Sequence, residues 1–284
     1  ASSVGVIGGA PKCSKTWLGL DLALSVATGS ACLGKYPVPE PGPVLAYLAE
    51  DALPVVRERV EGMARHRGLN FADVDIHVIT APVLRLDRDP HRTRLLETAK
   101  RLRPRLLLLD PLVRLHGIDE NNAGEVAQLL AYFRLLQRRL DLSVVLVHHT
   151  RKNAAGGVAA GQGLRGSSDI HAFGDSNLYL RRTSQRLVLS SEHRAAPASP
   201  PVFLELVVNE VEATHLEVVA ERGENQRRHL QEETLALLTD GAVLTRAKLR
   251  DTLSVKNERL GEALEGLERA GRIQRTPAGW QRVN

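Results

Sequence analysis

Long apolar runs, cysteines and aromatic residues are all scarce in this chain of 284 residues. No run of about 18 apolar residues occurs, which argues against a transmembrane helix and predicts a soluble protein without a membrane partner. Two cysteines, Cys13 and Cys32, are too few for a disulfide framework, and the chain opens at Ala1 without a secretion signal. We therefore expect a protein of the reducing cytoplasm, and the missing initial Met indicates a processed or trimmed chain.

The charge balance points only weakly to a partner. The chain has 38 Lys and Arg against 33 Asp and Glu, and the net charge of +5 slightly favours polyanions. Aromatic residues make up 4% of the chain, which argues against a groove that grips single-stranded nucleic acid by base stacking. Any such grip would be mostly electrostatic.

Residues 1 to about 150 alternate apolar runs with amphipathic stretches, which predicts strands and helices of a mostly parallel sheet. Strands are expected at 4–8, 44–49, 76–79, 106–110 and 143–148, and helices at 15–28, 53–68, 90–101 and 124–140. Alternating segments between Asn177 and Val219 predict antiparallel strands that extend this sheet. The glycine-rich stretch 150–168 is predicted to be a long functional loop.

The last sixty residues predict a small second domain. A polar linker at 221–226 precedes a first helix around Leu235, Thr245 caps a second helix, and a third ends at Gly271. A short hairpin then runs from Ile273 to Trp280. Three helices and a hairpin are typical of a winged helix-turn-helix, so we predict a mostly parallel α/β domain with an antiparallel extension at 1–222 and a winged-helix domain at 227–284.

The motif with the clearest chemistry is GAPKCSKT, from Gly9 to Thr16, which follows an apolar strand and opens a helix. In a phosphate-binding loop, backbone N–H groups surround the phosphates, the Lys15 ammonium reaches the β and γ oxygens, and the Thr16 hydroxyl binds Mg²⁺. Ser14 replaces the usual glycine and tolerates positive φ less well. We expect ATP and Mg²⁺ as cofactors, with nucleotide contacts from Gly9, Lys12, Cys13, Ser14, Lys15, Thr16 and Trp17.

Two acidic residues follow apolar strands. Asp110 closes the run LLLLD, and beside a phosphate-binding loop such a carboxylate holds Mg²⁺ together with Thr16. Glu50 ends VLAYLAE, where a carboxylate can orient or deprotonate the attacking water. Asp51 is the rival for this role, with capping of the helix near Leu53 as its alternative function.

His148 and His149 end the fifth predicted strand, where an imidazole can sense the γ-phosphate by a hydrogen bond. Adjacent strand residues face opposite sides, so only one of them can do this, and we choose His149. Lys152 and Arg165 flank the glycine-rich loop and are candidates for an arginine finger that completes a neighbouring subunit's site. The alternative is that both are solvated loop charges.

Arg114, after Asp110, offers another role for basic residues. Together with Arg151 and Lys152 it is placed to contact nucleic-acid phosphates in a central channel. The predicted third helix of the C-terminal domain carries four acidic residues, which would repel phosphate. DNA binding by that domain, through Lys256, Asn257, Arg259, Arg275 and Arg282, and docking to a protein remain alternatives.

Five stretches resemble the hexameric RepA-type replicative helicases of plasmids and the RecA-like ATPases around them: GGAPKCSKTWLGLDLALSVATG, VLAYLAED, LLLLDPL, VVLVHHTRK and LRGSSDI. The resemblance covers residues 4–220 and includes the order and spacing of the motifs. It implies a ring with ATP between subunits, Glu50 as catalytic carboxylate, His149 as γ-phosphate sensor and Arg165 reaching a neighbour. It also implies DNA-facing loops after Asp110 and after His149. Ser14 departs from the family pattern, and the C-terminal segment lies outside the matched region.

The leading functional hypothesis is an ATP-driven motor on single-stranded DNA, a ring-forming replicative helicase or translocase with a replication or loading partner. The alternative is a nucleotide-gated DNA-binding or regulatory ATPase that does not unwind. A small-molecule kinase is disfavoured, because no acceptor site or lid is evident beyond residues 150–168.

Overall fold

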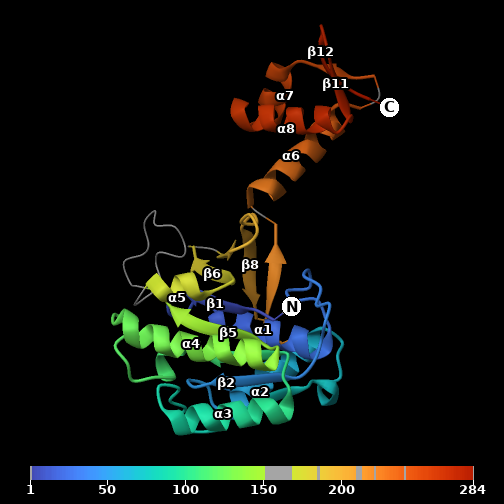
Figure 1. The fold of residues 1–284 in the computed structure, drawn as a ribbon. Coiled ribbons are helices and arrows are strands. Elements are labelled where there is room, and N and C mark those ends of the chain that lie inside the picture. Colours follow the sequence, from blue (N-terminus) through green and yellow to red (C-terminus); the bar gives the residue numbers. More distant parts are fainter. Residues whose placement is uncertain are drawn as a thin grey trace. The chain divides into compact units, whose positions relative to one another are not determined.

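The computed structural model describes residues 2–150, 168–183, 186–208, 213–220, 222–239 and 241–283 (Figure 1). Contacts divide the chain into two compact units, Ala1–Val219 and Ala220–Asn284. Among the described residues, no helix has both the length and the apolar character needed to cross a membrane.

The first unit is an α/β fold with helices on both faces of one nine-stranded sheet, in the order β3-β2-β4-β5-β1-β6-β7-β8-β9 (Figure 1). Its elements are β1 Val4–Gly9, α1 Lys15–Thr28, β2 Val44–Leu48, α2 Leu53–His66, η1 Phe71–Asp73, β3 Ile76–Val78, α3 Asp89–Leu102, β4 Leu106–Asp110, η2 Leu112–Arg114, α4 Ala123–Leu140, β5 Ser143–His149, α5 Ser168–Phe173, β6 Ser176–Arg182, β7 Leu187–His193, β8 Val202–Val207 and β9 His215–Val219. The predicted strands and helices of residues 1–150 are confirmed to within a few residues at each end.

The sheet is mostly parallel with an antiparallel extension, as predicted, but the change of direction lies one strand later than expected. β6 pairs in parallel with β1, and antiparallel pairing begins between β6 and β7 and continues through β8 and β9. A parallel neighbour needs a crossover connection, and the chain between β5 and β6 contains the short helix α5, for which the sequence carries no helical signal. The prediction of antiparallel strands was therefore wrong for the pairing of β6 with β1 and right for the pairing of β6 with β7.

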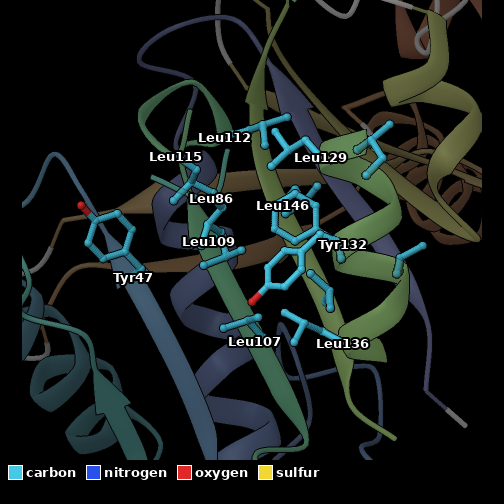
Figure 2. Packing of buried hydrophobic residues seen from close by; sticks show 14 of the residues in the cluster. Tyr47, Leu86, Leu107, Leu109, Leu112, Leu115, Leu129, Tyr132, Leu136 and Leu146 are labelled. Atoms are coloured by element: carbon cyan, nitrogen blue, oxygen red, sulfur yellow. The ribbon is translucent and has the colours of Figure 1, made fainter. Parts of the chain in front are cut away.

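The core lies on both faces of the central strands. On β4, Leu107 and Leu109 pack into one apolar cluster and Leu106 and Leu108 into the other, so this strand is buried on both sides. Figure 2 shows Leu107 and Leu109 beside α4 residues of the first cluster. Burial of one such side chain contributes about 1.5–3 kcal/mol, and the rigid sheet that results positions the polar residues at its carboxyl edge.

The second unit consists of α6 Arg222–Leu237, α7 Arg246–Leu253 and α8 Asn257–Arg269, with the strands β10 Val243–Leu244, β11 Ile273–Thr276 and β12 Gly279–Arg282 in a small antiparallel sheet. Thr245 caps α7 as predicted, because its hydroxyl oxygen accepts a hydrogen bond from the Lys248 backbone N–H at 3.2 Å. Its core is made of Leu235, Leu238, Leu249, Leu260, Leu264, Leu267 and Ile273.

Two features of this unit differ from the prediction. The expected linker at 221–226 is helical from Arg222, because α6 extends into a polar stretch that has no apolar period to reveal a helix. The two-residue strand β10 was not predicted, because a strand of that length carries no periodic signal.

Candidate functional site

The phosphate-binding loop joins the buried strand β1 to α1. The Lys15 ammonium lies under this loop and donates hydrogen bonds to the carbonyl oxygens of Gly9 at 2.9 Å and Ala10 at 2.8 Å. Burial lowers the pKa of Lys15, although the nearby carboxylates of Asp110 and Glu50 oppose this shift. The Lys15 ammonium is therefore bonded to two neutral carbonyl oxygens. Phosphate oxygens are charged acceptors and would form stronger hydrogen bonds with it.

Backbone geometry explains which residues the loop tolerates. A Cβ on Gly9 would lie 2.5 Å from the Leu180 carbonyl oxygen and 2.6 Å from the Cys13 sulfur, so no larger residue fits there. Ser14 and Lys12 both adopt the left-handed conformation, with φ of 66° and 61°. That conformation costs a non-glycine residue about 1–2 kcal/mol, so Ser14 must obtain compensation from its contacts.

Thr16 and Asp110 meet across the carboxyl edge of the sheet. The Thr16 hydroxyl donates a hydrogen bond of 2.7 Å to an Asp110 carboxylate oxygen. Burial raises the Asp110 pKa to about 6, against the opposing effects of this hydrogen bond and of Lys15. One hydroxyl and one carboxylate fit Mg²⁺, which keeps several waters and binds substrate phosphates rather than a full protein cage. Accordingly, no cluster of three or more His, Cys, Asp or Glu suited to a metal occurs within the described ranges.

The raised Asp110 pKa predicts that Asp110→Asn stabilises the nucleotide-free protein at pH 8. The folded protein binds the Asp110 proton more tightly than the unfolded chain does, so protonation of Asp110 stabilises the fold. This stabilisation of the parent protein is complete below pH 3.8 and is lost as the pH rises through about 6. Asparagine removes the buried charge, and the free energy of unfolding should rise by at most about 3 kcal/mol.

Urea unfolding at pH 8 and pH 4.5, without nucleotide or Mg²⁺, measures this effect. The difference in the free energy of unfolding between Asp110→Asn and the parent should be smaller at pH 4.5 than at pH 8. Asp73→Asn, at an exposed position, serves as the control. An Asp110→Asn variant that is less stable than the parent at pH 8 would contradict the prediction.

Glu50 and Asp51 follow β2 and are held by different cations. The Glu50 carboxylate accepts a 3.0 Å hydrogen bond from Arg114, and both side chains are at least half exposed. Asp51 pairs with Arg59 of α2 at 2.8 Å and makes no capping hydrogen bond, since α2 begins after Ala52 without a side-chain cap. The predicted alternative, that Asp51 caps α2, is therefore wrong. The Asp51 carboxylate instead forms an ion pair with Arg59 in α2.

The two histidines at the end of β5 have different surroundings. His148 is 1% exposed, whereas His149 faces the pocket formed by the loop. Burial, together with the positive charge of Lys15, lowers the His149 pKa, which favours a neutral imidazole. A neutral ring can donate one hydrogen bond to an oxyanion. Lys152, Arg165 and Arg151 lie outside the described residues.

A pocket of about 370 Å³ brings most of the predicted site together. The predicted residues that line it are Lys12, Cys13, Ser14, Lys15, Thr16, Trp17, Glu50, Asp110 and His149. Gly9 contributes its carbonyl to Lys15 rather than a wall of the pocket.

Apart from Leu48 of β2, which lies in a predicted strand, three lining residues were not predicted from the sequence. Arg59 lies with its guanidinium 5.2 Å from the centre of the Trp17 ring, Arg182 ends β6, and Leu206 belongs to β8. None of them belongs to a local motif. The pairing of β6 with β1 places Arg182 here, and that register could not be read from the sequence.

Comparisons with known proteins identify a family and a fold. A family model described as "AAA domain" (AAA_25) matches residues 1–155, more than half of the chain. The crystal structure of the RadB recombinase is similar in fold, with a TM-score of 0.56 and 17% sequence identity over 77% of this chain and 91% of that chain. The chain belongs to the AAA domain family AAA_25, and its first unit has the fold of RecA-like P-loop ATPases.

Proposed function

We propose that this protein is a DNA-dependent ATPase, a ring-forming replicative helicase or translocase of the RepA type. The observation that carries the ATPase part is the single pocket in which Lys15, Thr16, Asp110, Glu50 and His149 converge. These residues provide a phosphate-binding cation, oxygen ligands for a metal, a carboxylate for water and a hydrogen-bond donor for an oxyanion.

In this proposal each residue has one role. Lys15 exchanges its loop carbonyls for phosphate oxygens, and Thr16 and Asp110 hold Mg²⁺, which would supply positive charge to neutralise the polyphosphate. Glu50 orients the attacking water and accepts its proton. His149 hydrogen-bonds the γ-phosphate and lies at the end of β5, next to the residues proposed to contact DNA.

The proposed DNA side begins at Arg114. This exposed residue ends η2, directly after the Asp110 strand, and it bonds Glu50. A DNA phosphate that binds Arg114 would release the Glu50 carboxylate for water, which offers a physical reason for stimulation of hydrolysis by DNA. Arg165, Lys152 and Arg151 remain proposals as finger and channel residues.

Replacement of Arg114 tests this connection. Arg114→Ala should raise ATP hydrolysis without DNA about two- to fivefold, since a half-exposed ion pair contributes up to about 1 kcal/mol. It should also reduce the ratio of the rates with and without single-stranded DNA. Arg105→Ala, which removes a surface pair with Glu40, is the matched control. Stimulation by DNA that is unchanged in Arg114→Ala would contradict this role.

The second candidate function is a nucleotide-gated binding or regulatory ATPase that does not unwind, and it draws on residues 227–284. We propose that this segment is a winged-helix domain. Glu258, Glu262, Glu265 and Glu268 of α8 are all exposed, while its apolar side is buried in the small core. An acidic face opposes contact with DNA phosphates and favours docking to a protein.

Steady-state ATP hydrolysis with no DNA, single-stranded DNA and duplex DNA separates these functions. A motor predicts strong stimulation by single strands, strand separation in an unwinding assay, and rings in sedimentation experiments. A rate of hydrolysis that single-stranded DNA does not change, together with ATP-dependent binding to duplex DNA, would favour the nucleotide-gated binding protein. Nucleotide binding without either response would exclude both DNA functions.

A further inference from the structure

Arg182 is a cation of the pocket that no motif assigns. It is the last residue of β6, and the parallel pairing of β6 with β1 sets Leu180 beside Gly9, where the phosphate-binding loop starts. Two residues further on, the Arg182 side chain reaches this loop. One of its terminal nitrogens donates to the Lys12 carbonyl at 3.4 Å and to the Ser14 hydroxyl at 3.3 Å.

Arg182 contacts Ser14, the residue that replaces the usual glycine of the phosphate-binding loop. Glycine would suit the left-handed backbone here better, but it has no side-chain oxygen. The Ser14 hydroxyl accepts a hydrogen bond from Arg182, so the departure from the motif and the arginine form one arrangement. The guanidinium has five N–H donors, so several remain for a ligand.

The strand order indicates which part of a nucleotide Arg182 meets. Asp110 on β4 and His149 on β5 lie on one side of β1, whereas β6 lies on the other. The γ-phosphate belongs on the side of Asp110 and His149, because the metal ligand and the sensor are there. Arg182 therefore faces the polyphosphate away from the bond that is cleaved.

We propose that Arg182 binds the phosphates common to ATP and ADP within its own subunit, and that Ser14 holds its guanidinium over the loop. This inference rests on the proposed nucleotide site but not on any action on DNA. Arg182 is then a nucleotide-binding residue that sets affinity, and it takes no part in the chemical step.

The test is equilibrium binding of fluorescent ATP and ADP, each with Mg²⁺, to the full chain and its variants. Arg182→Ala should weaken binding of both nucleotides about tenfold, the size expected for one exposed charge-assisted hydrogen bond. Arg182→Lys should recover part of the loss, because lysine keeps the positive charge but not the planar guanidinium. Arg181→Ala is the matched control, because this neighbour is also exposed but points to the other face of the strand and does not line the pocket.

Ser14→Gly completes a double-mutant cycle. If Ser14 positions Arg182, the effect of Arg182→Ala should fall to about threefold in the Ser14→Gly background. Equal effects in both backgrounds would overturn the positioning role of Ser14. Thermal unfolding of each variant shows whether the loop remains folded.

Three other results would overturn the inference. Arg182→Ala that binds both nucleotides as Arg181→Ala does would exclude a binding role, and a loss for ATP alone would place Arg182 at the γ-phosphate instead. A parent chain that binds neither nucleotide would overturn the proposed function together with this inference, whereas the first two results leave the proposed function intact.

Discussion

Lys15→Ala is expected to lower ATP hydrolysis about 10²–10³-fold, the loss typical of removing one charged or polar group that stabilises the transition state. Lys15 is 6% exposed, and its ammonium is within reach of the loop that would hold the phosphates. Lys12 and Arg182 also line the pocket, but both are exposed, whereas Lys15 is buried and bonded to the loop carbonyls. The measurement is phosphate release at saturating ATP.

The control for this variant is Lys35→Ala, which removes an exposed lysine outside the pocket. Lys15 also ties two loop carbonyls, so the thermal unfolding midpoint must show that the variant is folded. A folded Lys15→Ala protein with the hydrolysis rate of Lys35→Ala would mean that hydrolysis occurs elsewhere.

Glu50→Gln is expected to lower the rate of hydrolysis about 10²–10⁴-fold while ATP binding changes little, because a general base acts mainly on the chemical step. Glutamine keeps the size and the hydrogen-bonding oxygen of the side chain, and it can still accept from Arg114. Single-turnover hydrolysis and nucleotide binding, measured on the same preparation, separate the two effects.

Asp51→Asn distinguishes the two neighbouring carboxylates. Its pair with Arg59 suggests a structural role in holding α2 against Trp17, so the rate should fall less than about tenfold. If Asp51→Asn loses hydrolysis and Glu50→Gln keeps it, Asp51 is the catalytic carboxylate and the assignment to Glu50 is wrong.

Much of the fold could be predicted because its signals are local. The strand LLLLD predicts β4 by its apolar run, and Thr245 marks the start of α7 by its capping side chain. The direction of β6 could not be predicted in this way, because it depends on the crossover that contains α5. α6 begins at Arg222 rather than after a linker, since a polar helix has no apolar period to reveal it.

The residues of the candidate site also fall into those that belong to local motifs and those that only the tertiary structure brings to the pocket. Lys15, Thr16 and Asp110 could be predicted because a strand followed by a phosphate-binding loop fixes their relation to the sheet. Arg182 and Arg59 reach the pocket from distant segments, and only the register of β6 and the packing of α2 place them there.

Calorimetric titration of the full chain with ATP, in the presence and absence of Mg²⁺, tests the central claim most directly. The structure predicts one site per chain, with a dissociation constant between about 1 µM and 1 mM, and weaker binding when Mg²⁺ is removed or Asp110 is replaced by asparagine. Absence of binding at millimolar ATP, or binding that neither Mg²⁺ nor Lys15→Ala affects, would contradict a nucleotide site in this pocket.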